Sequence, residues 1–279
     1  MEITLNSGFS IPQLGLGTWQ AKGDDVANAV KHALSVGYRH IDTAVGYSNE
    51  ADVGRGLADA DIPREEVFVT TKITNAAWTK EAAATQITDS LSRLGTDYLD
   101  LVLVHWPGST ERNVAVYRAM EEAVDSGSIR SIGISNFNIH HIDALLEHAR
   151  ITPAVNQMEC HISLKNTRLK EYLDEKGIAL EAYAPLKSMK IQDVLENGTL
   201  KEIGSAHGKT PAQVSIRWLL QRGIIPLPKS ITPSRIEQNF DVFDFELSDD
   251  EMLAIRKLNK AERLFPEPDN VDFGFVKFS

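Results

Sequence analysis

LDLVLVHW, residues 99–106, is a run of apolar residues that Asp100 and His105 alone interrupt. A continuous apolar run, in contrast to an alternating one, is typical of a strand buried on both faces of a parallel sheet. Seven further runs of this kind occur on either side of it. They are QLGLGT (13–18), YRHIDT (38–43), VFVTTK (67–72), IRSIGISN (129–136), AVNQME (154–159), IALEAYAPL (178–186) and IIPLPKS (224–230). The sequence therefore predicts eight strands.

The segments between these runs have the spacing of amphipathic helices. Val26, Val30 and Leu34 fall on one helical face, and Thr210-Pro211 and Thr232-Pro233 are typical helix starts. No Pro/Gly/Ser-rich linker divides the chain. Strands that alternate with helices in this way predict an α/β fold, a (β/α)8 TIM barrel, as a single domain over residues 1–279.

Two features at the N-terminus bear on this interpretation. ITL and FSI flank Asn6-Ser7-Gly8, which predicts a β-hairpin that caps the bottom of the barrel. The run LGLGTW (14–19) and a strand that ends in Asp42 imitate a dinucleotide-binding fingerprint, so an open doubly wound sheet is the alternative fold. Gln20 stands where the third glycine of that fingerprint belongs, which favours the barrel.

Composition limits the class of protein. The chain has 279 residues, a formal charge of −10 and a sequence pI near 5.3, which argues against a nucleic-acid partner. No run approaches the ~20 apolar residues that cross a bilayer, so we expect no membrane association. Cys160 is the single cysteine, which leaves no disulfide framework. We expect a cytoplasmic protein.

Titratable residues end several of the predicted strands. Asp42, Lys72 and His105 end the second, third and fourth, and Tyr47 lies on the loop after Asp42. In a barrel these ends meet at the face that carries active sites. A nearby Lys72 ammonium is expected to lower the pKa of Tyr47 and make it a proton donor, with Asp42 orienting Lys72 and His105 polarising a carbonyl oxygen.

Each of these residues also has a structural interpretation. An Asp–Lys pair at a strand end is more often a structural salt bridge, a histidine after an apolar strand is commonly a satisfied core group, and a tyrosine near a turn usually packs. Only their joint placement at one rim favours a shared site.

Six motifs resemble the aldo-keto reductase superfamily, and within it the bacterial group similar to 2,5-diketo-D-gluconic acid reductase. The resemblance covers nearly the whole chain in order. The motifs are IDTAVGYSNE (41–50), VTTKI (69–73), DLVLVHWPG (100–108), IGISNF (132–137), AVNQMECH (154–161) and LPKSITPSRIEQN (227–239).

The resemblance implies a catalytic tetrad of Asp42, Tyr47, Lys72 and His105, with Tyr47 as the general acid in carbonyl reduction. It implies NADPH (NADP⁺) bound across the barrel mouth, with the Ser135–Asn136 pair and Gln157 on the nicotinamide carboxamide. The implied cofactor contacts are Gly17, Thr18, Trp19, Asp42, Ser135, Asn136, Gln157, Tyr183, Leu186, Lys229, Ser230, Ile231, Thr232, Arg235, Gln238 and Asn239. The implied substrate contacts are Trp19, Tyr47, His105 and Trp106. No metal is implied.

The adenosine end has independent support from the residues. Lys229, Arg235, two hydroxyls and the helix start at Thr232-Pro233 converge in an otherwise acidic chain, which suits an anion. Ordinary surface charges on a helix are the alternative. With the resemblance, NADPH is favoured over NADH.

The sequence departs from the family pattern in places. KITNAAW (72–78) leaves open whether Trp78 lines the pocket, MECHIS (158–163) replaces the usual run, and APLKSMK (184–190) lacks the glycines of a phosphate-spanning loop. The tail 263–279 is expected to set substrate selectivity. Its aromatic residues, which either cover the pocket or dock the tail, are Phe265, Phe273, Phe275 and Phe278.

The sequence thus predicts an NADPH-dependent carbonyl reductase, an enzyme and a monomer, acting on a small dicarbonyl, a keto-sugar acid or an aldehyde. Two other classes stay open. A cofactor-sensing module without turnover is opposed by the intact tetrad. A metal-dependent barrel hydrolase finds its only hints in His140-His141 and in Glu159 with His161.

Overall fold

The computed structural model describes residues 1–270. Eight parallel strands form one sheet in the order β10-β9-β8-β7-β6-β5-β4-β3. Neighbours in the sheet are therefore neighbours in sequence, as right-handed βαβ connections require. The strands are β3 (Leu16–Gly17), β4 (His40–Asp42), β5 (Phe68–Ile73), β6 (Leu99–Val104), β7 (Ile129–Ser135), β8 (Val155–Glu159), β9 (Ala179–Tyr183) and β10 (Ile224–Pro226).

The first and last strands meet and close the barrel. Gly17 pairs with Lys229 in a parallel bridge, and the amides of Gly15 and Gly17 donate to the carbonyls of Pro226 and Pro228, both at 3.1 Å. Close approach needs glycine here, because a Cβ on Gly15 would lie 2.6 Å from Nδ1 of His40. The (β/α)8 barrel is confirmed, and the open doubly wound sheet is wrong.

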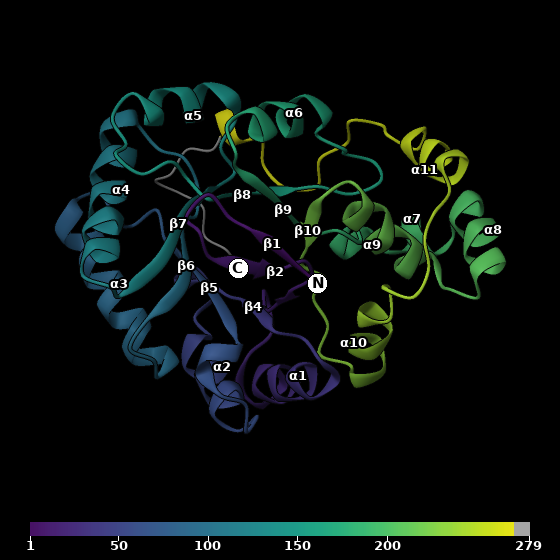
Figure 1. Cartoon of the computed structure of the whole chain (residues 1–279), viewed down its shortest axis with the longest axis horizontal. Coiled ribbons are helices and arrows are strands. Elements are labelled where there is room, and N and C mark those ends of the chain that lie inside the picture. Colours follow the sequence, from purple (N-terminus) through teal and green to yellow (C-terminus); the bar gives the residue numbers. More distant parts are fainter. Residues whose placement is uncertain (271–279) are drawn as a thin grey trace.

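Helices surround the strands in a ring (Figure 1). One helix or more follows each strand, and α7 and α8 are extra elements between β9 and α9. The helices are α1 (Gly23–Val36), α2 (Glu50–Ala58), α3 (Lys80–Leu94), α4 (Thr110–Asp125), α5 (Ile139–Leu146), α6 (Thr167–Glu175), α7 (Gln192–Leu195), α8 (Gly198–His207), α9 (Pro211–Gln221), α10 (Pro233–Phe240) and α11 (Asp249–Arg256). Within residues 1–270, none combines the length and the apolar character that crossing a membrane needs.

The predicted hairpin is present and lies across the centre of the ring (Figure 1). It consists of β1 (Glu2–Thr4) and antiparallel β2 (Ser10–Pro12). Its turn is held to the amino ends of two barrel strands, because Asn6 donates to the Pro153 carbonyl at 2.9 Å and Ser7 shares a hydrogen bond with Ser131 at 2.8 Å. The hairpin therefore closes the end of the barrel opposite to the carboxyl ends of the strands.

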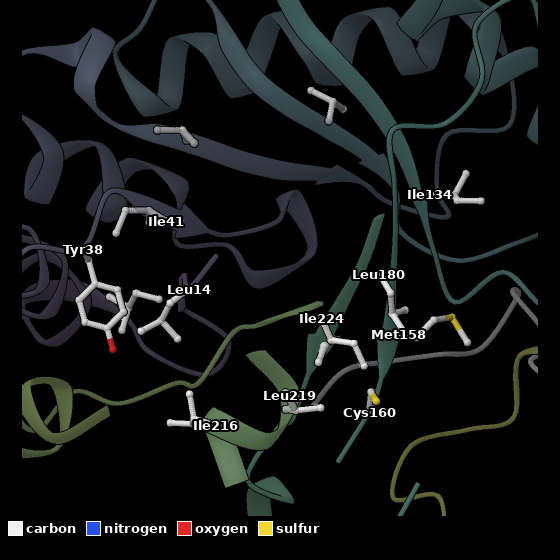
Figure 2. Packing of buried hydrophobic residues seen from close by; sticks show 14 of the residues in the cluster. Leu14, Tyr38, Ile41, Ile134, Met158, Cys160, Leu180, Ile216, Leu219 and Ile224 are labelled. Atoms are coloured by element: carbon white, nitrogen blue, oxygen red, sulfur yellow. The ribbon is translucent and has the colours of Figure 1, made fainter. Parts of the chain in front are cut away.

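Alternate strand residues face opposite sides of the barrel wall. Outward residues such as Ile41, Ile134, Leu180 and Ile224 belong to a large buried cluster that also contains helix residues such as Ile216 (Figure 2). Inside the barrel, a separate apolar cluster fills the amino end. Its members are Leu5, Ile11, Phe68, Leu101, Leu103, Ala154, Val155 and Ile225.

A buried polar layer lies between this inner apolar cluster and the mouth. His40, Thr70 and Glu181 are each 0 % exposed. His40 Nε2 lies 3.0 Å from Thr70 Oγ1 and 3.7 Å from Glu181 Oε1. Because β4, β5 and β9 alternate with period two, the next inward residues toward the mouth are Asp42, Lys72 and Tyr183. The floor of the barrel mouth is therefore polar.

Candidate active site

The carboxyl ends of β4, β5 and β6 bring together the four titratable residues predicted from the sequence. Asp42 is the last residue of β4, Lys72 lies near the end of β5, and His105 follows β6. Tyr47 ends a short 3-10 helix, η1 (Val45–Tyr47), that continues from β4. The structure brings the four residues together at one rim, and their catalytic roles stay predictions.

Lys72 is the centre of this group. Its Nζ donates to Asp42 Oδ1 at 2.6 Å, to the Thr43 carbonyl at 2.8 Å and to Tyr47 Oη at 3.3 Å. The Lys72 side chain is 0 % exposed and that of Asp42 is 5 % exposed. All three ammonium hydrogens thus have acceptors, as a buried charge requires.

The charges set the protonation of this group. Burial opposes the Lys72 ammonium, but Asp42 and Tyr47 together keep its pKa above the usual value. Burial raises the pKa of Tyr47, and the ammonium of Lys72 pulls that pKa down without reversing the shift. Lys72 thus lowers the Tyr47 pKa as expected, but burial outweighs it, so the prediction of a net lowering is wrong. A raised pKa keeps the phenol protonated at neutral pH, as a proton donor requires.

His105 faces Tyr47 across the rim, with ring centroids 5.7 Å apart. Burial, followed by the positive charges of Lys72 and Arg112, holds the pKa of His105 well below its usual range. The imidazole is therefore neutral at pH 7 and offers one N–H donor and one acceptor nitrogen.

A second polar group extends from the ends of β7, β8 and β9. Ser135 donates to the Gln157 carbonyl at 2.9 Å, and Tyr183 Oη donates to Asn136 Oδ1 at 2.8 Å. Gln157 Nε2 donates to Asp42 Oδ2 at 2.8 Å, which joins this group to the first. Ser135, Asn136, Gln157 and Tyr183, predicted to hold one end of a cofactor, thus lie beside the four residues above.

All residues of both groups except Lys72 line one cavity of about 380 Å³ at the barrel mouth. Lys229 and Arg235 line the same cavity and supply positive charge to it. Of the predicted cofactor contacts, the following line it: Gly17, Thr18, Trp19, Asp42, Ser135, Asn136, Gln157, Tyr183, Leu186, Lys229 and Arg235.

The remaining predicted cofactor contacts do not line the cavity. Ser230, Ile231 and Thr232 form the turn before α10, where the Thr232 amide donates to Ser230 Oγ at 3.1 Å. On α10, Gln238 is exposed and Asn239 is buried. Their contact with a ligand stays a prediction.

Aromatic residues form the wall beside Tyr47 and His105. Trp19, Trp106 and Phe265 line the cavity, and Phe265 packs edge-on against Trp19 and Tyr183 with centroids 5.4 and 5.3 Å apart. Trp78 is 55 % exposed and is not among the lining residues. Phe273, Phe275 and Phe278 lie outside the described residues.

The two metal hints have other roles in the structure. Glu159 is fully buried, lies 2.9 Å from His161 Nε2, and accepts the amides of Leu264 and Phe265 at 2.7 and 3.2 Å. Glu159 therefore anchors the segment that contains Phe265, and Phe265 lines the cavity. The MECHIS run thus positions the cavity wall.

His140 and His141 approach Asp269, with Nε2–Oδ1 distances of 3.3 and 3.6 Å. His141 Nδ1 accepts the Asn138 amide at 3.2 Å, so a neutral His141 ring carries its hydrogen on Nε2. That nitrogen is then a donor to Asp269 and has no lone pair for a metal. None of the three residues lines the cavity.

Sequence reasoning missed Arg112, on the first turn of α4. Its guanidinium donates to the carbonyls of Ala77 at 3.1 Å, Trp106 at 2.9 Å and Thr74 at 3.2 Å, and so joins the loops after β5 and β6. Burial lowers its pKa to about 10. Its partners are backbone carbonyls, which leave no mark in the sequence, so no sequence signal was available.

Comparison with known proteins adds to this geometry. The sequence profile of the Aldo/keto reductase family matches residues 13–260. Methylglyoxal reductase DkgA of Escherichia coli K12 is 42 % identical over 268 residues, which are 96 % of each chain. The aldo-keto reductase MGS-M4, from a Medee basin deep-sea metagenome library, is 49 % identical with a TM-score of 0.95, and the match covers 97 % of this chain and 99 % of that one. An aldo-keto reductase (AKR2E5) solved with NADPH is 33 % identical with a TM-score of 0.89 over 94 % and 89 % of the chains.

Proposed function

The chain belongs to the aldo/keto reductase family, and from that membership we propose that it reduces a small aldehyde or ketone to an alcohol with NADPH, Tyr47 donating the proton. The observation that carries the proposal is Lys72 Nζ, which contacts both Asp42 and Tyr47 beneath an apolar-walled cavity. The relative solved with NADPH supports the cofactor.

The residues present fit this cofactor. Lys229 and Arg235 in the lining suit phosphate groups, and the polar group around Gln157 suits an amide. Tyr183 also lines the cavity and offers an aromatic ring for stacking. When bound, NADPH supplies the hydride.

The chain's own residues then handle the proton. Tyr47, protonated because its pKa is raised, gives its hydroxyl hydrogen to the carbonyl oxygen as that oxygen becomes negative. Lys72 stabilises the phenolate that remains, and Asp42 holds Lys72 in place. Neutral His105 donates an N–H to the same oxygen and fixes its direction.

The lining favours a small, uncharged carbonyl compound as substrate. Trp19, Trp106 and Phe265 supply apolar surface, and the proposal assigns the lining cations, Lys229 and Arg235, to the phosphates of the cofactor. The Escherichia coli relative is named a methylglyoxal reductase, so methylglyoxal is the first substrate to test. A keto-sugar acid would need a further cation, which the described lining does not offer.

Tyr47→Phe tests the mechanism. It keeps the ring and removes the proton, so NADPH oxidation with methylglyoxal and aromatic aldehydes, followed by absorbance, should fall roughly 100- to 10,000-fold. NADPH binding, measured by fluorescence, should change little. Tyr98→Phe is the matched control, because the Tyr98 hydroxyl has no partner among the described residues and lies outside the cavity.

Two outcomes would contradict the proposal. Full activity in Tyr47→Phe would exclude this residue as the donor. NADPH binding by the wild-type chain without turnover of any carbonyl compound would favour the cofactor-sensing class. The cytoplasmic location, the monomeric state and the single domain stay predictions.

A further inference from the structure

Glu181 is a buried carboxyl group that the proposed mechanism does not use. It lies in the middle of β9 and points into the barrel, and its side chain is 0 % exposed. Burying a carboxyl group costs free energy unless its oxygens find partners. Its contacts are therefore informative about its role.

The main partner of Glu181 is Gln157. Gln157 Nε2 donates to Glu181 Oε2 at 2.9 Å and to Asp42 Oδ2 at 2.8 Å. The two amide hydrogens are thus both used, and both neighbours are acceptors. The amide nitrogen must face inward, which leaves Gln157 Oε1 as the side-chain atom available to a ligand in the cavity that Gln157 lines.

The surroundings of Glu181 let it accept this hydrogen bond without adding a negative charge. His40 Nε2 lies 3.7 Å from Glu181 Oε1, and burial lowers the pKa of His40 to about 3, so no positive charge offsets an ionised Glu181 from that side. Burial and then the charge of Asp42 raise the pKa of Glu181 to about 8. Neutral Glu181 keeps a carbonyl oxygen toward Gln157 and leaves Asp42 to pair with Lys72.

We propose that Glu181 is a positioning residue for the cofactor: by accepting one amide hydrogen of Gln157, it fixes that side chain so that Gln157 Oε1 receives the N–H of the nicotinamide carboxamide. The proposal rests on the proposed function, in which Gln157 contacts that carboxamide. Asp42 accepts the other amide hydrogen. Loss of Glu181 therefore makes the Gln157 side chain more mobile, but its amide group does not turn round to exchange oxygen and nitrogen.

The test compares two ligands on two variants. Glu181→Met has nearly the length of the native side chain but no acceptor, whereas Glu181→Gln retains an oxygen toward Gln157. NADPH probes the whole site, and adenosine 2′,5′-bisphosphate probes the adenosine end without a nicotinamide. The Kd of each ligand is measured by fluorescence or calorimetry on folded protein.

Glu181→Met should raise the Kd of NADPH about 2- to 10-fold, the value of one net hydrogen bond. It should leave the Kd of adenosine 2′,5′-bisphosphate unchanged, and Glu181→Gln should bind both ligands like the wild type. If Glu181→Met does not fold, Glu181→Asp replaces it, because its shorter side chain withdraws the carboxyl group from Gln157, and the same selective loss is expected.

Three results would overturn the inference: unchanged NADPH binding in the variant that lacks the acceptor, equal loss of both ligands, or equal loss in Glu181→Gln. A wild-type chain that does not bind NADPH would instead refute the proposed function, so the two failures are distinguishable.

Discussion

Arg235 is an exposed residue and one of the two cations that line the cavity. If these cations hold a 2′-phosphate, Arg235→Ala should weaken NADPH binding about 10-fold or more, because a guanidinium binds a phosphate with charge-assisted hydrogen bonds. NADH lacks that phosphate, so its Kd should stay the same. Titration of both nucleotides measures the difference, and a parallel loss of NADH affinity would remove Arg235 from phosphate binding.

Glu181 should also give the folded protein a pH-dependent stability. Its pKa of about 8 lies above the ordinary value of 4.5, so folding takes up a proton between these two values. The contribution of this group to the free energy of unfolding is then most favourable below pH 4.5 and falls by on the order of 5 kcal/mol as the pH rises to 8. Glu181→Gln cannot ionise and should lack this decline.

Urea unfolding of both proteins at several pH values measures this effect, since other titrating groups cancel in the difference. Parallel curves for wild type and Glu181→Gln from pH 5 to 8 would show that Glu181 is ionised in the folded protein.

At the scale of elements, the closing contact between β3 and β10 depends on Gly15. Gly15→Ala would place a Cβ 2.6 Å from both His40 Nδ1 and Leu227 Cδ2, so we expect a loss of roughly 1–3 kcal/mol in the free energy of unfolding. Gly198→Ala is the control, because nothing lies within 4 Å of its Cβ position at the start of α8. Chemical denaturation compares the two, and equal stability would mean that the barrel adjusts at no cost.

The strand order could be predicted from the sequence because each buried strand leaves an apolar run and each run lies in chain order around the barrel. The apolar runs are longer than the strands that they predict. QLGLGT contains only the two residues of β3 (Leu16–Gly17), because Gly15 and Thr18 make isolated backbone hydrogen bonds that do not extend the strand. The extra helices α7 and α8 have no strand between them to mark their boundaries.

The site could be predicted where a polar residue ends a strand, as at Asp42, Lys72 and His105. Glu181 lies in the interior of IALEAYAPL. A single acid inside an apolar run does not show whether its side chain points into or out of the barrel. Its partners, Gln157 and Asp42, are distant in sequence, and their distances appear only once the barrel closes. Arg112 was missed for the same reason.

At the scale of the whole molecule, Glu159 ties the last described segment to the barrel through the amides of Leu264 and Phe265. In Glu159→Gln, one oxygen can still accept one of these two backbone amides. The NH₂ group then faces the other amide, and two donors cannot form a hydrogen bond. The segment around Phe265 should loosen, which raises the KM for carbonyl substrates more than it lowers kcat. Hydrogen exchange at Leu264 and Phe265 reports the loosening directly, and unchanged protection there would exclude Glu159 as the anchor.

The bridge between Gly17 and Lys229 also has a consequence for how the chain is made. Asp42, Tyr47, Lys72 and His105 leave the ribosome early, yet the barrel cannot close until Lys229 follows, 229 − 105 = 124 residues after His105. At ~5–20 residues per second, this interval lasts roughly 6–25 s. During it, the β3 edge and the inner apolar cluster of an unfinished barrel are exposed, so this is the period when a nascent chain most needs chaperone protection.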